Sequence, residues 1–118
     1  MNAAEEMCAA AQRLRTRAAA ATRGPWHCGP AIDGLKDVYG PDNQHVSGGD
    51  WPVAVIGDSE WMALMSPEVA DELARILDAT ASVVYMTQCL NTEHYAVLDF
   101  ARLVNRKVVT PRAAQEAQ

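Results

Sequence analysis

Glycine is missing from both ends of this sequence. All seven glycines lie between Gly24 and Gly57, and four of the six prolines fall in the same window. Because glycine and proline interrupt helices and favour turns, long helices are expected only outside this window. The sequence therefore predicts a helix, then a region of short strands and turns, and then further helices, which is an α+β fold.

The chain also lacks an excess of positive charge and any long apolar run. Its net charge is -5 at pH 7, which disfavours non-specific binding to nucleic acids and to anionic membranes. No run approaches the ~20 apolar residues that span a bilayer. The N-terminus carries Glu5 and Glu6, where a secretory signal has positive charge. We therefore expect a cytoplasmic protein that binds no membrane.

Disulfides are not expected to hold the fold together, because three cysteines cannot form a closed framework of pairs. The chain has 118 residues, of which 49% are hydrophobic, and this is enough for one core without such bridges. We predict a single α+β domain over residues 1–109, followed by a frayed polar tail over residues 110–118.

Capping signals and periodic apolar residues predict four helices. Asn2 followed three positions later by Glu5 has the spacing of a capping box. Apolar residues then recur every three or four positions, which predicts a helix over residues 3–22 that ends before Gly24 and Pro25. The same signals predict helices over residues 59–65, 67–90 and 93–104. Within the third of these, residues 83–85 are also compatible with a strand.

Short apolar runs between turn signals predict a small antiparallel sheet of about three or four strands over residues 26–56. Gly48 and Gly49 have the composition of a hairpin turn, and Pro52 belongs at the start or the edge of a strand. Helices are expected to cover one face of this sheet. The apolar stripes after Pro67 exceed what so small a sheet can cover, so we also expect a homodimer that shares a helical surface.

Three tryptophans, Trp26, Trp51 and Trp61, lie at the edges of the predicted strand region. Exposed rings would form a platform for a partner side chain or a nucleobase. The chain has a single phenylalanine, however, and each indole buries a large area, so we favour core positions for these rings. Trp51, beside Pro52 on a predicted edge, is the expected exception.

The basic residues are few and gather near the first predicted helix, at Arg13, Arg15, Arg17 and Arg23. We interpret them as a solvated helix surface. The alternative is a face that follows a phosphate backbone, although proteins of that kind are usually basic over the whole domain. Arg23 and Arg75 are also the cations that we consider for an anionic small-molecule ligand.

Four side chains of the types that bind zinc are His27, Cys28, Cys89 and His94. Structural zinc sites usually contain closely spaced pairs of cysteine or histidine, such as Cys-x2-4-Cys. Here Cys28 has no second cysteine nearby in the sequence. We therefore expect no metal and no other cofactor.

Acidic residues cluster in the predicted turns, and His45 lies nearby in the sequence; they are Asp33, Asp37, Asp42, Asp50 and Asp58. A His–Asp pair or two carboxylates can do general acid–base chemistry. Aspartate is also favoured in turns for local reasons, because its side chain bonds its own backbone. No nucleophile elbow or phosphate-binding loop is visible, and we expect no enzyme activity.

Two blocks of the sequence resemble a family of small phage and prophage proteins, the Ead type, which is common in actinobacterial phages. Residues 21–26, Ala-Thr-Arg-Gly-Pro-Trp, resemble the Ala-Thr-Pro-Gly-Pro-Trp motif near the start of those proteins. Residues 58–63, Asp-Ser-Glu-Trp-Met-Ala, resemble their Asp-Ala-x-Phe-Ile-Ala block, and the segment from Pro67 to Leu77 resembles their alanine-rich helix. The resemblance covers about residues 18–80. Arg23 stands where the family has proline, and Trp61 with Met62 replaces its usual pair.

This resemblance implies a phage or prophage origin and an accessory role towards the host, and it offers no catalytic residues to transfer. We therefore predict a non-catalytic protein of the host cytosol that binds a host protein. The candidate binding residues are Arg23, Trp26, Trp51, Trp61 and Arg75. The alternatives are a small-molecule binder that sequesters a nucleotide-type signal and, disfavoured by the charge, nucleic-acid binding through the N-terminal helix.

Overall fold

The structure is a computed structural model that describes residues 1–32, 34–47 and 54–107. The predicted tail over residues 110–118, the Gly48–Gly49 turn and Trp51 lie outside the described residues. The chain divides into two compact units. The helical unit consists of residues 1–16 and the residues from 72 onward, and the sheet unit consists of residues 17–71. That they form one domain over residues 1–109 stays a prediction.

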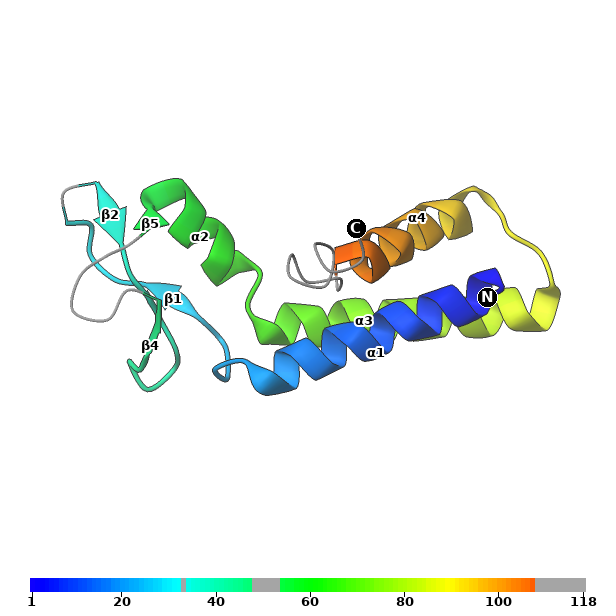
Figure 1. Ribbon diagram of the computed structural model, residues 1–118, viewed down its shortest axis with the longest axis horizontal. Helices are drawn as coiled ribbons and strands as arrows, with labels where there is room; N and C mark the ends of the chain where they lie inside the picture. The colour runs from blue at the N-terminus through cyan, green and yellow to red at the C-terminus, as the bar shows by residue number, and fades with distance from the viewer. Residues whose placement is uncertain (33, 48–53, 108–118) are drawn as a thin grey trace, which may run out of the picture. The chain divides into compact units, whose positions relative to one another are not determined.

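Four helices lie in the described part of the chain, and they confirm the predicted α+β class (Figure 1). They are α1 (Ala3–Ala20), α2 (Ile56–Leu64), α3 (Pro67–Thr87) and α4 (Thr92–Lys107). Each end lies within three residues of its predicted position. Residues 83–85 belong to α3, so the helical alternative for this segment is confirmed. No helix in the described ranges is long and apolar enough to cross a bilayer.

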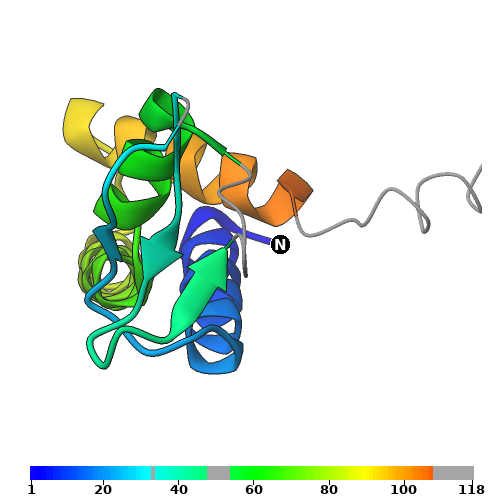
Figure 2. The ribbon, with the colours of Figure 1, turned by 90° about the vertical axis from the view of Figure 1, so that its left-hand side faces the viewer.

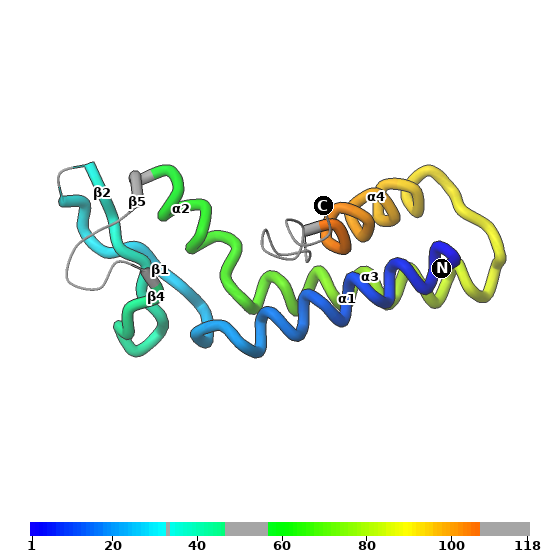
Figure 3. The backbone as a smooth tube through the Cα atoms, viewed as in Figure 1, coloured from blue at the N-terminus to red at the C-terminus, as the bar shows by residue number. Residues whose placement is uncertain are grey.

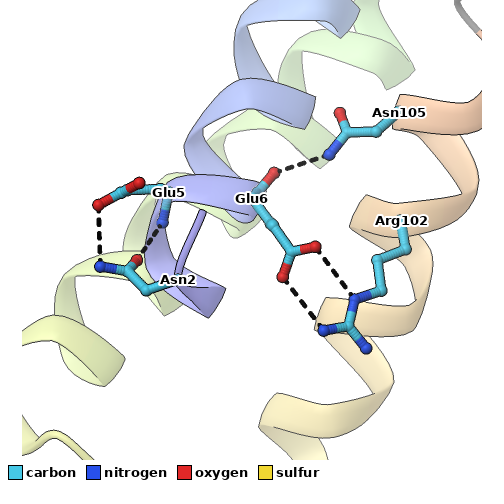
Figure 4. Close-up of polar contacts among 5 residues, drawn as sticks. All are labelled: Asn2, Glu5, Glu6, Arg102 and Asn105. Atoms are coloured by element: carbon cyan, nitrogen blue, oxygen red, sulfur yellow. Dashed lines mark hydrogen bonds and ion pairs between the residues drawn. The ribbon is translucent and has the colours of Figure 1, made fainter.

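The first turn of α1 contains the predicted capping box (Figure 4). The backbone N–H of Glu5 donates to Oδ1 of Asn2 at 2.8 Å, and Nδ2 of Asn2 donates to Oε1 of Glu5 at 2.9 Å. The first N–H groups of a helix have no acceptor within the helix. The side chain of Asn2 provides an acceptor for one of these groups, which would otherwise need a water molecule. The capping residues therefore fix where α1 begins.

Replacing Asn2 by alanine is expected to lower the free energy of unfolding by about 1 kcal/mol, because the cap is lost. Urea unfolding followed by circular dichroism at the helix band measures this change. Gln12→Ala is the matched control, since Gln12 is exposed on the same helix and is not a cap. Equal effects of the two substitutions would contradict a capping role for Asn2.

In the helical unit, α1 and α3 run antiparallel side by side and α4 packs against them (Figures 1 and 2). Their shared core consists of the buried residues Ala4, Met7, Ala10, Ala11, Ala74, Leu77, Ala81, Val84, Leu98 and Ala101. Six of these ten are alanines. Because alanine has the smallest apolar side chain, the helix backbones can approach one another closely.

Polar contacts join α1 to α4 beside this core (Figure 4). The guanidinium of Arg102 donates two hydrogen bonds to the carboxylate of Glu6, each of 3.2 Å. These hydrogen bonds and the negative charge of Glu6 raise the pKa of Arg102. Nδ2 of Asn105 donates to the backbone carbonyl of Glu6 at 3.1 Å. Glu6 therefore holds two residues of α4 that lie almost one turn apart.

Two of the arginines on α1 are engaged within the helical unit. Arg15 forms an ion pair with Asp78 of α3 at 2.5 Å, and Arg13 donates to the backbone carbonyl of Asn105 at 3.4 Å. Both side chains are half-buried, whereas Arg17 is exposed. Arg13 and Arg15 are thus only partly solvated and are also held by partners within the unit. The reason is tertiary packing, since both meet partners more than 60 residues away in sequence.

In the described part of the sheet unit, whose backbone Figure 3 traces, five short strands form two antiparallel sheets. The larger sheet has the order β1-β3-β4, with β1 at His27–Cys28, β3 at Val38–Tyr39 and β4 at His45–Ser47. The smaller sheet pairs β2 (Leu35–Lys36) with β5 (Ala54–Val55). The predicted small antiparallel sheet is therefore confirmed, and a second strand pair accompanies it.

Helix α2 covers these strands, as predicted for a helix packed on a sheet. It contacts β1, β2, β3 and β5. The buried hydroxyl of Ser59 donates to the backbone carbonyl of Lys36 at 2.7 Å, and Nζ of Lys36 lies 3.2 Å from the carboxylate of Glu60. The side of α2 that carries Ser59 therefore faces the strands.

Candidate functional site

Three aromatic rings stand in a row across the larger sheet. His27, Tyr39 and His45 come from adjacent strands and are paired with one another in the strand register. The ring centres of His27 and Tyr39 are 5.8 Å apart, and those of Tyr39 and His45 are 4.8 Å apart. Cross-strand neighbours on one face of a sheet meet at such distances. We call these three residues the ring row.

A buried carboxylate lies beside the ring row. Asp37 is only 6% exposed, and its Oδ2 accepts a hydrogen bond of 3.3 Å from the hydroxyl of Tyr39. Nδ1 of His45 lies 3.8 Å from the same oxygen. Its other oxygen, Oδ1, is buried with no hydrogen-bond partner among the described residues. Of the turn aspartates named from the sequence, Asp37 is thus the one that lies beside His45 among the described residues.

The environment of Tyr39 keeps its phenol protonated. Desolvation and the nearby negative charge of Asp37 raise the pKa of Tyr39 above its usual value of 10.0. This direction agrees with the geometry, in which the hydroxyl of Tyr39 donates to the carboxylate of Asp37. Because the Tyr39 hydroxyl is already bonded to Asp37, the part of this arrangement that suits recognition of a planar group is the set of ring faces.

A pocket of about 390 Å³ opens beside the ring row. Its lining consists of His27, Cys28, Gly29, Pro30, Tyr39 and Asn43. None of these described residues is a lysine or an arginine, so they offer no permanent cation to a phosphate. The pocket therefore fits a neutral planar ligand better than an anionic one.

Gly29 has no room for a side chain. A Cβ atom at this position would lie 2.5 Å from Cε2 of Tyr39, so Gly29→Ala is expected to push the Tyr39 ring away and to lower the free energy of unfolding by about 1–3 kcal/mol. Proton NMR shifts of the Tyr39 and His27 rings measure the displacement. Gly57→Ala is the control, because a Cβ there meets nothing within 4 Å. Unchanged ring shifts in Gly29→Ala would contradict the close packing.

The tryptophans occupy different environments. Trp26 is half-buried, and its indole N–H donates to the backbone carbonyl of Thr22 at 2.8 Å. Trp61 lies on α2 and is 62% exposed, so the expected core position is wrong for this ring. The reason is the direction of α2, which turns Ser59 towards the strands and Trp61 towards solvent. Trp51 lies outside the described residues.

Trp61 belongs to an exposed apolar surface at the end of α2. Leu64 is 64% exposed and Met65 is 40% exposed. Positions i, i+3 and i+4 lie on one side of a helix, so these three side chains form one surface, which we call the α2 patch. Exposed acidic residues, Asp58 and Glu60, lie on the same helix.

Comparison with known families, curated proteins and solved structures does not place this chain in a family. The chain matches no protein-family model, and no curated protein or solved structure is significantly similar to it. The resemblance to Ead-type phage proteins therefore stays a prediction. The function has to be inferred from the residues themselves.

The four predicted binding residues that the structure describes are divided between the two units. Arg23, Trp26 and Trp61 belong to the sheet unit, and Arg23 is exposed. Arg75 belongs to the helical unit, where it forms an ion pair of 2.9 Å with Glu72. Neither arginine lines the pocket beside the ring row. The small-molecule alternative relied on Arg23 and Arg75 to bind an anionic ligand, and this pocket contains neither of them.

The possible zinc ligands are likewise divided between the units. His27 and Cys28 belong to the sheet unit, and Cys89 and His94 belong to the helical unit. Within the described ranges, no group of three or more histidine, cysteine or acidic side chains is arranged to hold a metal ion.

Sequence reasoning missed Tyr39 as a member of the candidate site. The available signal was its position one residue before the Gly40–Gln44 turn, with His45 directly after the turn. Two residues that flank a hairpin turn are cross-strand neighbours.

Proposed function

We propose that this chain is a phage-type accessory protein that acts without catalysis, by binding a host protein through the α2 patch. The observation that supports this proposal is the exposure of Trp61 together with Leu64 and Met65. Tryptophan is one of the residue types that are enriched at binding hot spots. A soluble surface gains nothing from exposing three large apolar side chains together, so a partner is the simplest reason to retain them.

The spacing of the α2 patch indicates the shape of its partner. Anchors at i, i+3 and i+4 are typical of a helix that lies in an apolar groove. Asp58 and Glu60 are exposed on the same helix, and the chain as a whole carries a net charge of -5. The partner is therefore expected to present an apolar groove with basic side chains at its rim.

Site-specific photo-crosslinking in an actinobacterial host tests this proposal. A benzophenone amino acid placed at position 61 is expected to form a discrete adduct with one host protein. The same amino acid at position 42 is the control, because Asp42 is exposed in the sheet unit but lies outside the patch. An excess of the unmodified protein should abolish the adduct, whereas an excess of Trp61→Ala should not.

The outcomes separate specific binding from chance contact. An adduct that forms at position 61, is absent at position 42 and fails to compete with Trp61→Ala supports the proposal. Adducts of equal yield at both positions, or none at position 61, would refute it. Circular dichroism of Trp61→Ala establishes that the loss of competition does not come from unfolding, which is not expected for a side chain that is mostly exposed.

A second candidate function is small-molecule binding at the ring row. The pocket beside His27 and Tyr39 favours a planar heterocycle that stacks on the rings. Native mass spectrometry with adenosine, guanosine and their monophosphates tests it. An added mass on the natural protein that is lost in Tyr39→Ala would support this function, and no added mass with any of the four probes would dismiss it. Nucleic-acid binding is less favoured, because Arg13 and Arg15 are engaged within the helical unit.

A further inference from the structure

Helix α3 carries a second apolar stripe on the side away from its core. Ile76 is 53% exposed, Val83 is 47% exposed and Met86 is 81% exposed, and Ala79 between them is exposed as well. Spacings of three, four and three residues keep these four side chains on one side of the helix. We call them the α3 stripe. The opposite side of α3 faces the core of the helical unit. Its buried residues are Ala74, Leu77, Ala81 and Val84.

The α3 stripe itself carries no charge. The exposed residues Glu72 and Arg75 precede it on the helix, and Glu5 of α1 lines a pocket with Ser82 and Tyr85 beside it. The exposed positions from 76 to 89 are Ile76, Ala79, Ser82, Val83, Tyr85, Met86, Thr87, Gln88 and Cys89. The one charged residue in this segment is Asp78, which is half-buried and paired with Arg15 at 2.5 Å. Charged residues make up 21% of the chain, so a neutral stretch of this length is a distinct surface.

We propose that the α3 stripe packs against the same stripe of a second copy of this chain. Each copy carries a net charge of -5, so two copies repel one another wherever their charged surfaces meet. A neutral apolar stripe is a face on which they can approach without that cost. The three-four-three spacing is that of a coiled-coil seam, which is self-complementary when two identical helices pair. This proposal is independent of the α2 patch and of the proposed function.

The sequence of the stripe favours an antiparallel pair. In that arrangement Ile76 lies opposite the partner's Met86, and Ala79 lies opposite the partner's Val83, so that all four apolar positions are covered. In a parallel pair, by contrast, Glu72 at the start of the exposed side would lie opposite the partner's Glu72. In the antiparallel pair these like charges lie at opposite ends of the contact. The two helix dipoles also point in opposite directions, which is favourable for helices that lie side by side.

The length of the stripe indicates a weak dimer. It extends over 11 residues, from Ile76 to Met86, and such a helix is about 15 Å long. This contact is smaller than a standard interface, which buries about 800 Å² on each partner. We therefore expect dissociation in the micromolar range, and the association has to be measured over a series of concentrations.

Sedimentation velocity from low to high micromolar concentration tests the surface. The natural chain is expected to shift from monomer to dimer, and Val83→Glu is expected to remain monomeric. Leu103→Glu is the matched control, because Leu103 is a partly exposed apolar residue of α4 outside the stripe, and it should dimerise like the natural chain. A natural chain that stays monomeric, or a dimer that Val83→Glu leaves intact, would overturn the proposal.

Oxidative cross-linking tests the orientation in a background in which Cys8, Cys28 and Cys89 are replaced by serine. Ser82 is exposed and lies next to the two-fold axis of the antiparallel pair, so Ser82→Cys should form a disulfide-linked dimer. Met86→Cys should not, because the two positions would lie about 15 Å apart along the axis. Cross-linking by Met86→Cys in place of Ser82→Cys would overturn the antiparallel arrangement. Circular dichroism of each variant shows that its helices are intact.

Discussion

Leu77→Ala is expected to lower the free energy of unfolding by about 3 kcal/mol. Leu77 is fully buried in the core of the helical unit, among residues of α1, α3 and α4. Its removal loses the transfer free energy of the side chain and leaves a cavity that the helices can fill only in part. Urea unfolding followed by circular dichroism measures the change, since most of the described chain is helical.

Leu103→Ala is the control for this prediction, because the same side chain is removed from a partly exposed position. It should cost less than about 1 kcal/mol. If the two substitutions destabilised the protein equally, Leu77 would not occupy the centre of the core.

Ala11→Leu is expected to destabilise the protein by about 1–3 kcal/mol, although leucine is the more hydrophobic residue. Ala11 is fully buried where α1 meets the other helices. Three extra carbon atoms in this position force the helices apart or drive the side chain out of its preferred rotamers. The free energy of unfolding in urea and the midpoint of thermal unfolding should both fall.

Ala96→Leu provides the comparison, because Ala96 is exposed on α4. Its effect should lie within about 0.5 kcal/mol of zero. A stabilising effect of Ala11→Leu would mean that the core contains unfilled space at this position, and it would contradict the close approach of the helices.

The helices could be predicted from the sequence because their signals are local. Asn2 and Glu5 form the expected capping box, and α3 begins at the expected residue, Pro67. Caps and three-four spacing depend on residues within one or two turns, so no knowledge of the tertiary structure is needed to interpret them.

The choice of buried face in α3 could not be predicted in this way. Ile76 and Leu77 are adjacent and both apolar, and so are Val83 and Val84. In each pair the structure buries the second residue and exposes the first. Periodicity shows that two stripes exist, but the packing of α1 and α4 decides which of them becomes core, and that contact joins residues far apart in the sequence.

Only part of the candidate site could be predicted from the sequence, for the same reason. His45 and the turn aspartates were recognisable as residue types for acid–base chemistry, but the sequence did not select Asp37 among them. The place of Tyr39 between His27 and His45 depends on strand register. The exposure of Trp61 depends on how α2 is rotated over the strands. A count of aromatic residues favours burial for every tryptophan, and only the tertiary structure identifies the exception.

The alanine-rich core of the helical unit has a thermodynamic consequence. Each alanine removes little apolar surface from water, so unfolding should raise the heat capacity less than is usual for a chain of this length. The free energy of unfolding of the helical unit should then vary only gently with temperature. The largest value that it reaches should be small. For small proteins, 1 kcal/mol shifts the melting temperature by several degrees. Any ligand or second copy that binds only the folded chain should therefore raise its melting temperature by a readily measured amount.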